Sequence, residues 1–489
     1  MLKILIEKEL KAILLSPKFI ATFGICSVLI LLSVMLGIRE FNTASKQYTA
    51  ALNLVDQELR ETTNLMMLST KTYRKPDPMQ IFVAGIQNDI GRFSSINTFT
   101  PVKLQSSTYS ENPLFAVFRF IDFTFIVVIV LSLFAILFTY DAINGEREGG
   151  TLKLIFANPI PRTSYILAKF IGSWLGLIIP LLVPILLGLL LIVLFAVPIT
   201  AGQWQNLLLF LLFSVLYFTF FIGLSLSISA MTRRSSSSFM ALLVLWVSLV
   251  LIIPRSGVLI ATQLISAPTF AEVEARIDGF SKEQWQGYWE IREKKIRERS
   301  KQIQSLSKEE REAFEDDNSW GWMEEDEKEK NAMEAAIADY SSKLNEERRN
   351  KKMAQERLGF SISRISPASA FQLASMHLAG THLSLKSYYE DQMKNYRNDF
   401  IAYKEQKQRE SGEGHGGIQI RASSSGEFVV KAGRNAGAVD LSGMPEFAPP
   451  MHSLSAGFAA VAVDFGLLTF FSAVVFTIAF VAFQRYDVR

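Results

Sequence analysis

Long apolar runs alternate with strongly charged stretches along this chain of 489 residues. A lipid bilayer has a hydrocarbon core about 30 Å thick, which a helix of roughly 20 apolar residues can cross. Six runs approach or exceed this length, and each is predicted to be a transmembrane helix. They cover residues 19–38, 120–140, 163–197, 207–231, 239–254 and 461–484. The pattern therefore predicts an all-α polytopic membrane protein with six transmembrane helices.

Two of the runs depart from the ordinary span length. The third is long and contains Pro180 and Pro184, so we expect this helix to be tilted, kinked or broken near its middle. The fifth is short, and we expect it to end within the outer leaflet. Before the first run, residues 1–18 place leucine and isoleucine at helical spacing with lysines between them. This segment is predicted to be an interfacial amphipathic helix along the inner membrane surface; the alternative is that it begins the first span, but Pro17 favours a break.

Lysine and arginine in the short connections predict the orientation of the helices, since short cytoplasmic segments are enriched in both. Basic residues precede the first run, separate the second from the third and the fourth from the fifth, and follow the sixth. These segments lie on one side of the membrane only if the number of spans is even. Both termini are therefore expected in the cytoplasm of a bacterial inner membrane. The long segments 39–119 and 255–460 are expected outside it.

The two outer segments differ in composition. Segment 39–119 mixes polar and apolar residues with four prolines, which predicts a small mixed layer. Within 255–460, residues 270–359 are rich in Glu, Lys, Arg, Gln and Ala and predict long helices with charge pairs four residues apart. This helical outer domain is either a solvated hairpin without a site or a module coupled to the rest of the protein. Residues 411–443 are rich in Gly and Ser and predict a mobile loop, with two β-prone pieces that would suit a hairpin.

Composition and charge exclude several function classes. Hydrophobic residues make up 49% of the chain and charged residues 20%, so the two kinds are segregated along it. The formal net charge of +3 is too small, and too evenly distributed, to favour a nucleic-acid-binding face. The single cysteine, Cys26, excludes a disulfide framework and a thiolate metal site. His377 and His382 are five residues apart, so on one helix they point to different faces and cannot share a metal; we expect them to be structural or exposed.

The connection at residues 141–162 has the composition of a docking element. Residues 146–148 form a Glu-Arg-Glu turn beside two glycines, and residues 151–157 have the length of a short amphipathic helix that an Asn-Pro pair closes. The apolar face of this helix can enter the inner membrane interface while the three charges face the cytoplasm. Such an element is suited to contact a cytosolic partner.

This connection resembles one in the permease subunits of ATP-binding cassette (ABC) transporters of the second exporter type. Their hallmark is an acidic-Arg-Glu turn, then Gly-Thr-Leu, then a short helix that ends in a Pro-x-x-Arg step; here these stand at 146–148, 150–152 and 159–162. Family members with a large outer domain before the last span also carry Ser-Pro and Phe followed by Ala-Gly-Thr, similar to residues 365–371 and 378–381. The long helical outer insertion departs from minimal family members and leaves the transported substrate open.

The resemblance implies a transport subunit rather than an enzyme. The chain lacks the Gly-x-x-x-x-Gly-Lys-Ser/Thr phosphate loop, so a separate ABC ATPase subunit would bind ATP and Mg, and this chain would hold no cofactor. The permease would form a homodimer or pair with a sister permease chain, surrounded by membrane lipid. The short helix would be the coupling helix. The residues that couple it to the ATPase would be Glu146, Arg147, Glu148, Thr151 and Leu152.

Three functions are compatible with this pattern. The first is ATP-driven export of an unidentified substrate. The second is ATP-driven mechanotransmission to the outer domain without transport, and the third is a receptor-like membrane scaffold without an ATPase. The sequence does not name a substrate.

Two carboxylates and a pair of glycines are further candidates. Asp122 and Asp464 lie at the outer ends of the second and sixth runs and are candidate substrate or gating residues, although simple hydration at the interface also accounts for them. Gly172 and Gly176 form a small-xxx-small pattern that permits close helix packing. We expect this packing to occur within the chain rather than in a dimer.

Overall fold

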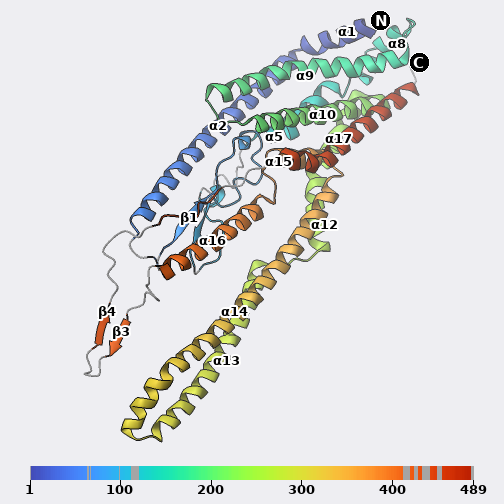
Figure 1. Cartoon of the computed structure of the whole chain (residues 1–489). Coiled ribbons are helices and arrows are strands. Elements are labelled where there is room, and N and C mark those ends of the chain that lie inside the picture. The colour runs from blue at the N-terminus through green and yellow to red at the C-terminus, as the bar shows by residue number, and fades with distance from the viewer. Residues whose placement is uncertain are drawn as a thin grey trace. The chain divides into compact units, whose positions relative to one another are not determined.

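The computed structural model describes residues 2–62, 65, 68–98, 100–111, 121–410, 419–422, 428–431, 441–448 and 454–485 (Figure 1). The chain forms two compact units. The first comprises Met1–Ile252 together with Ser366–Arg489, and the second comprises Ile253–Ile365. Six helices of the described chain are long and apolar enough to cross a membrane. The prediction of an all-α polytopic membrane protein with six transmembrane helices is therefore confirmed.

The N-terminal part of the chain forms two separate helices. α1 covers Leu2–Leu14, and α2 covers Pro17–Arg60. Ser16 caps α2 by accepting a hydrogen bond from the Phe19 N–H at 3.2 Å, and proline is well suited to the first turn that follows. α2 continues beyond the predicted first span as a single helix of 44 residues. Its second half contains no glycine or proline and is rich in residues that favour helix.

The second and fifth spans each contain a π-helical segment. The second combines α5 (Phe123–Phe125), the π-helix η2 (Ile126–Leu131) and α6 (Ser132–Thr139). The fifth begins with α11 (Ser235–Trp246) and continues into the π-helix η3 (Val247–Ile252). A π-helix bonds each N–H to the carbonyl five residues earlier, so it is wider than an α-helix.

Side chains from several helices hydrogen-bond to these π-helical segments. The hydroxyls of Ser132 and Tyr217 donate to the Val128 carbonyl in η2 at 2.6 and 3.2 Å. The Ser366 hydroxyl donates to a carbonyl of η3. The Trp246 indole N–H, just before η3, donates to Ser132 Oγ at 2.8 Å. The two spans that contain π-helices are therefore tied directly to each other.

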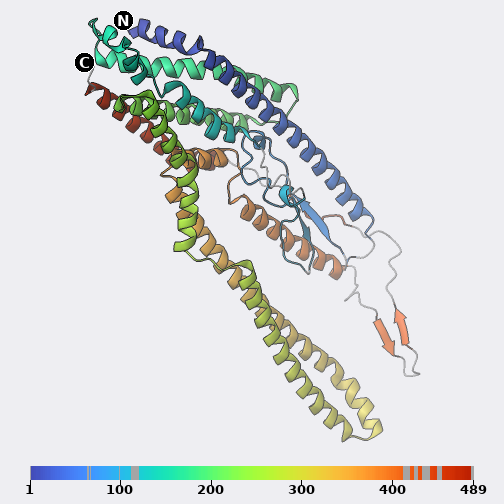
Figure 2. The same ribbon diagram turned by 180° about the vertical axis from the view of Figure 1, so that it is seen from behind.

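The remaining spans are continuous helices. α9 covers Arg162–Leu194, α10 covers Ala201–Met231 and α17 covers Leu454–Gln484. The sequence predicts that this third span is tilted, kinked or broken near its two prolines. α9 runs through Pro180 and Pro184 without interruption, so the helix is not broken there. α10 and α17 lie side by side in both views (Figures 1 and 2).

The second sequence motif forms the two ends of a buried helix, α15 (Pro367–Leu378). Ser366 caps the first turn by accepting two backbone N–H hydrogen bonds at 3.1 and 3.4 Å. At the other end Gly380 has a φ of +67°, and the Thr381 N–H reaches back to a carbonyl of α15 at 2.9 Å. Between the caps Phe371 is fully buried and stacks on a tyrosine of α10, with ring centroids 4.9 Å apart. The residues of this motif therefore serve to begin, end and bury α15.

The segment between the first two spans forms a small mixed layer. β1 (Thr70–Tyr73) pairs antiparallel with β2 (Phe93–Ile96), so that the first residue of β1 faces the last residue of β2. Two short helices, η1 (Pro78–Ile81) and α3 (Thr108–Glu111), belong to the same segment. α16 (Leu385–Glu410) packs on this layer. Their shared core includes Leu68, Ile90, Ile96, Leu104, Met393 and Phe400.

The Gly/Ser-rich segment contains a second two-stranded sheet. β3 (Gln419–Ala422) pairs antiparallel with β4 (Phe428–Lys431). These strands overlap the two β-prone pieces of the sequence, 417–420 and 427–430, and begin two residues and one residue later. The rest of the predicted mobile loop, at 411–418, 423–427 and 432–440, lies outside the described residues.

The second unit consists mainly of long helices. It contains α12 (Ile253–Leu264), which continues the helix of η3 past the predicted end of the fifth span, and the packed pair α13 (Phe270–Gln304) and α14 (Lys308–Ser363). Lys295 of α13 binds Glu329 of α14 at 2.6 Å. Charge pairs four residues apart follow both helices, as the composition predicts: Glu293–Arg297, Asp339–Lys343 and Glu347–Lys351.

Candidate functional site

The connection between the second and third spans folds into two short helices. α7 covers Asn144–Glu148, and α8 covers Thr151–Phe156. Gly150 lies between them with a φ of +70°, a conformation that glycine adopts at little cost, and it lets the chain turn. The expected charged turn is therefore one turn of helix, and the expected amphipathic helix ends one residue earlier than the sequence suggests.

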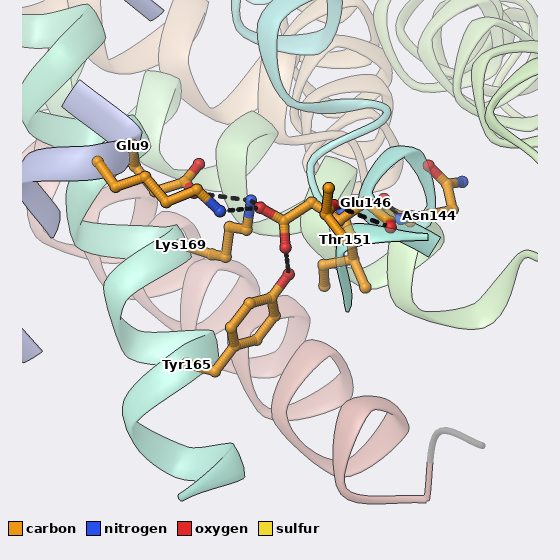
Figure 3. A network of polar contacts seen from close by, with 9 residues as sticks. Glu9, Asn144, Glu146, Thr151, Tyr165 and Lys169 are labelled. Carbon is orange, nitrogen blue, oxygen red and sulfur yellow. Dashed lines mark hydrogen bonds and ion pairs between the residues drawn. The ribbon is translucent and has the colours of Figure 1, made fainter. Parts of the chain in front are cut away.

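Glu146 of α7 points into the protein, where three side chains bind it (Figure 3). Its Oε1 accepts hydrogen bonds from Lys8 Nζ at 2.7 Å and from Lys169 Nζ at 2.9 Å. Its Oε2 accepts one from the Tyr165 hydroxyl at 2.5 Å, and Lys169 also binds Glu9 at 2.8 Å. Two lysines thus face two carboxylates, and their formal charges cancel. We call these five residues the Glu146 network.

Two glycines of α9 bring α1 close enough for this contact. A Cβ at Gly172 would lie 2.6 Å from the Glu9 Cβ, and one at Gly176 would lie 3.3 Å from Ile13 Cδ1. Lys169 shares this face of α9, because spacings of three and four residues return to the same side of a helix. The small-xxx-small pattern therefore packs two helices of one chain, as predicted. α1 and α9 lie side by side in both views (Figures 1 and 2).

Three charged members of the Glu146 network are shielded from solvent, whereas the Lys8 side chain is 47% exposed. The exposed fraction of the side chain is 5% for Lys169, 11% for Glu9 and 14% for Glu146. Removing water from a charge costs several kcal/mol, which opposite charges offset only when their geometry is good. Deleting one partner of a buried pair therefore costs about 3–5 kcal/mol, against about 0–1 kcal/mol for an exposed pair. The contact that joins α1, α7 and α9 is consequently sensitive to the loss of Glu9, Glu146 or Lys169, and less so to the loss of Lys8.

The opposite side of α7 binds the connection between the fourth and fifth spans. Glu148 accepts hydrogen bonds from the Ser235 backbone N–H at 3.2 Å and from the Ser235 hydroxyl at 2.6 Å. Asn144 is buried, and its Nδ2 donates to Thr232 Oγ1 at 2.9 Å while its backbone N–H donates to Ser229 Oγ at 3.3 Å. α7 is thus held between α1 and α9 on one side and the α10–α11 connection on the other.

The last span reaches the same region. Arg162 Nη1 donates to the Gln484 carbonyl at 2.5 Å, and the rings of Tyr165 and Phe483 stack with centroids 4.9 Å apart. Phe156 of α8 packs against both of these rings. α1 and the C-terminal end of α17 lie at the same end of the first unit (Figure 1). The connection that contains α7 and α8 is therefore bonded to several spans at once.

The residues predicted to contact an ATPase occupy different environments. Glu146 binds within the chain and is largely shielded, whereas the sequence suggests that it faces the cytoplasm. Glu148 binds Ser235 and is exposed. Thr151 Oγ1 donates to the Glu146 carbonyl at 3.1 Å, and the Leu152 side chain is buried. Arg147 is partly exposed. Their assignment to an ATPase contact stays a prediction.

Sequence reasoning does not single out the partners of Glu146. Lys8, Glu9, Tyr165 and Lys169 carry no motif. One signal could have marked Lys169, because an ionisable residue within an apolar run is a functional-site hypothesis in its own right. The exposed surface of α8 includes Leu154, whose side chain is 70% exposed and which the sequence motif does not mark.

The two candidate carboxylates lie outside the Glu146 network. Asp122 caps α5: its Oδ1 accepts a hydrogen bond from the Phe125 N–H at 2.8 Å, and its Oδ2 accepts one from the Ala84 N–H at 3.0 Å. Asp464 lies in α17 and is fully buried. A substrate or gating role for either residue stays a prediction.

Within the described part of the chain, no group of three His, Cys, Asp or Glu side chains is placed to hold a metal ion. The rings of His377 and His382 are nevertheless stacked, with centroids 4.7 Å apart. The prediction that they point to different faces is wrong because α15 ends at Leu378, and the left-handed Gly380 turns the chain back. The Ser384 hydroxyl lies 2.7 Å from His382 Nδ1 and satisfies that nitrogen.

Known proteins share sequence with this chain. Two relatives are named as probable ABC transporter permease protein NosY: one from Pseudomonas aeruginosa is 44% identical over 52 residues, which are 11% of this chain and 19% of that protein. The other, from Stutzerimonas stutzeri, is 48% identical over 46 residues, which are 9% of this chain and 17% of that protein. The chain thus matches less than a fifth of the length of these relatives. A model of the family described as ABC-2 family transporter protein, in contrast, matches residues 3–488, and the chain therefore belongs to the ABC-2 family of transporter proteins.

Proposed function

We propose that this chain is the membrane subunit of an ABC exporter and that α7 and α8 couple it to a separate ATPase subunit. The observation that carries this assignment is the Glu146 network, which joins α7 to the N-terminal helix and to the third span. Membership of a transporter family supports a permease that works with an ATPase. ATP and Mg would bind to that partner, and this chain would export an unidentified substrate.

The contacts of α7 suggest how movement would be passed to the spans. Closure of the ATPase subunits around ATP would displace α8, whose exposed surface includes Lys153 and Leu154. α7 would follow α8, because Thr151 is bonded to the Glu146 carbonyl. The displacement would reach α1 and α9 through the Glu146 side chain and the α10–α11 connection through Glu148. Several spans would then respond together.

The same arrangement favours one membrane orientation. α1 and the end of α17 lie at the same end of the first unit, and an even number of spans would return the chain to its starting side (Figure 1). Both termini would face the cytoplasm of a bacterial inner membrane, where the ATPase is found. The permease would act as a homodimer or with a sister permease chain.

Reversing Arg147 to Glu should reduce the amount of ATPase subunit that co-purifies with the permease. Arg147 is the partly exposed residue between two glutamates that bind within the chain. Loss of a desolvated charge contact at an interface costs about 2–5 kcal/mol, whereas loss of a solvated surface charge costs under ~1 kcal/mol. The measurements are the ATPase retained per permease after affinity purification and the ATP turnover of the purified complex.

Lys46→Glu is the matched control, because it reverses one exposed charge on α2. This control should retain the ATPase and its turnover. The Arg147→Glu complex could instead keep the same amount of ATPase and the same ATP turnover as the Lys46→Glu complex. In that case α7 makes no charged contact with an ATPase, and the coupling assignment fails.

Single cysteines test the orientation. In a Cys26→Ser background, an impermeant thiol reagent added to spheroplasts should label Ser305→Cys and leave Ser236→Cys unlabelled, because two arginines directly before Ser235 predict a cytoplasmic connection. Ser236 is exposed, unlike Ser235, whose hydroxyl binds Glu148. Both cysteines should react once the membrane is permeabilised. The reverse pattern in intact spheroplasts would overturn the orientation.

A further inference from the structure

A cavity of about 760 Å³ lies in the first unit, among the segments that connect its spans. One wall is a face of α2 that carries Tyr48, Leu52 and Val55 at helical spacing. All four residues of β1 line the cavity. The rest of the lining comes from α16 and from residues 441–447. None of these residues belongs to the Glu146 network.

One edge of β1 has no strand partner in the part of the chain that the structure describes. This sheet has two strands, so β2 occupies only one side of β1. The Arg74 N–H donates to the Arg92 carbonyl at 2.8 Å, which makes residue 74 a hydrogen-bonded position. Hydrogen-bonded and non-hydrogen-bonded residues alternate along an antiparallel pair of strands, so the backbone N–H and C=O groups of Thr72 also point toward β2. The N–H and C=O groups of Lys71 and Tyr73 therefore point away from β2, to the open edge.

The side chains around this edge suit a ligand that is largely uncharged. Asp56 of the lining pairs with Arg60 at 2.8 Å, and Lys71 pairs at 3.4 Å with Glu58, which lies outside the lining. These four charges cancel, and Glu446 adds one carboxylate to the lining. The apolar and aromatic part of the lining includes Tyr48, Leu52, Tyr73, Tyr396, Met444 and Phe447. A matching ligand needs apolar or aromatic side chains and, beside them, backbone donors and acceptors.

We propose that this cavity binds an extended segment of a partner polypeptide, which adds as a strand to the open edge of β1. Strand addition gives affinity through main-chain hydrogen bonds and specificity through pockets for alternate side chains. The four residues of β1 span about 13 Å, so the paired segment is about four residues long. A lipid chain would fit the apolar walls but would leave the backbone groups of Lys71 and Tyr73 without partners. Peptide binding at this edge is a property separate from the proposed coupling to an ATPase. It does not depend on that coupling, so it can be tested in the absence of ATP.

A random pool of synthetic nonapeptides tests the binding on the full-length protein in nanodiscs. Retained peptides are identified by mass spectrometry, and the dissociation constants of the enriched sequences are measured by fluorescence polarisation. We expect apolar or aromatic residues to be enriched at alternate positions. Each enriched peptide is also made in two N-methylated forms, one methylated at the odd and one at the even residues. One form should bind about tenfold or more weakly and the other as the unmethylated peptide does, because one net hydrogen bond corresponds to about a tenfold change.

Two pairs of variants place the peptide in the cavity. Leu52→Trp fills the cavity from α2 and should weaken binding at least about tenfold, whereas Leu54→Trp adds the same bulk at an exposed position outside the lining. Lys71→Pro removes the backbone N–H that points to the open edge, and it leaves the hydrogen bonds to β2 in place. It should also weaken peptide binding about tenfold. Lys71→Ala keeps the backbone donor and should bind as the unmodified protein does.

Equal retention of the enriched peptides by the Leu52→Trp and Leu54→Trp proteins would overturn this site. So would a pool from which nothing is enriched over empty nanodiscs. A phospholipid that native mass spectrometry finds on the detergent-purified protein, and that the Leu52→Trp variant loses, would identify a lipid as the occupant and would equally exclude the peptide.

Discussion

Replacing Lys169 with methionine should lower the free energy of unfolding of the permease by about 3–5 kcal/mol. Methionine keeps most of the apolar length of the lysine side chain but removes its charge. Glu9 and Glu146 then lose the cation that they share, at 2.8 and 2.9 Å, while both carboxylates stay shielded from water. The thermal midpoint of the purified protein in one detergent, followed by tryptophan fluorescence, measures the loss.

Two further variants make this result specific. Lys46→Met removes an exposed lysine from α2 and should change the free energy of unfolding by under ~1 kcal/mol. Adding Glu9→Gln to Lys169→Met should recover part of the loss, because it removes the carboxylate that has lost its cation, whereas Glu146 keeps Lys8 at 2.7 Å. A Lys169→Met protein that melts at the same temperature as Lys46→Met would show that the Glu146 network contributes nothing to stability.

Gly85→Ala should also destabilise the protein strongly, by about 2–5 kcal/mol. Gly85 has a φ of +51°, which costs other residues about 1–2 kcal/mol. A Cβ at this position would lie 2.4 Å from the Thr381 carbonyl oxygen, and relieving such a clash adds about 1–3 kcal/mol. That carbonyl is held in place, because it accepts a hydrogen bond from the Ile86 N–H at 3.1 Å. The thermal midpoint again reports the effect.

Gly279→Ala is the control for this substitution. Gly279 lies inside α13, and a Cβ there would meet no atom within 4 Å. Alanine should therefore stabilise the helix by about 1 kcal/mol. A Gly85→Ala protein with the stability of the Gly279→Ala protein would mean that the loop yields without cost and that the Ala-Gly-Thr motif does not constrain it.

The spans could be predicted because the requirement behind them is local. A membrane-crossing helix must be apolar along its whole length, and each such run is visible in the sequence. α8 could be predicted for a similar reason, since glycines precede it and an Asn-Pro pair follows it. Helix ends were harder where no breaking residue marks them. α2 runs on to Arg60 because the polar residues after the first span favour helix as much as the apolar ones do.

The Glu146 network could not be predicted, because its members come from three separate segments. Gly172 and Gly176 predict that a helix packs closely on α9, but they do not say which one. Only the fold places Glu9 opposite Gly172 and so beside Lys169. A charge next to glycines usually meets solvent, and Glu146 departs from that expectation because its partners lie elsewhere in the chain.

The π-helical segments η2 and η3 constrain how this protein can change through evolution. A turn of π-helix accommodates about one residue more than a turn of α-helix. Deleting one codon within either segment would therefore restore an α-helix, but it would turn everything beyond that point by about 100° and shift it by about 1.5 Å. Trp246 directly precedes η3, Ser132 directly follows η2, and a hydrogen bond of 2.8 Å joins them. Losing a residue from η2 would turn Ser132, which follows it, away from Trp246, whereas a loss from η3 would leave Trp246, which precedes it, in place. A deletion in η2 therefore has to be matched by a compensating change in the second or the fifth span, and η2 is the less tolerant of the two segments.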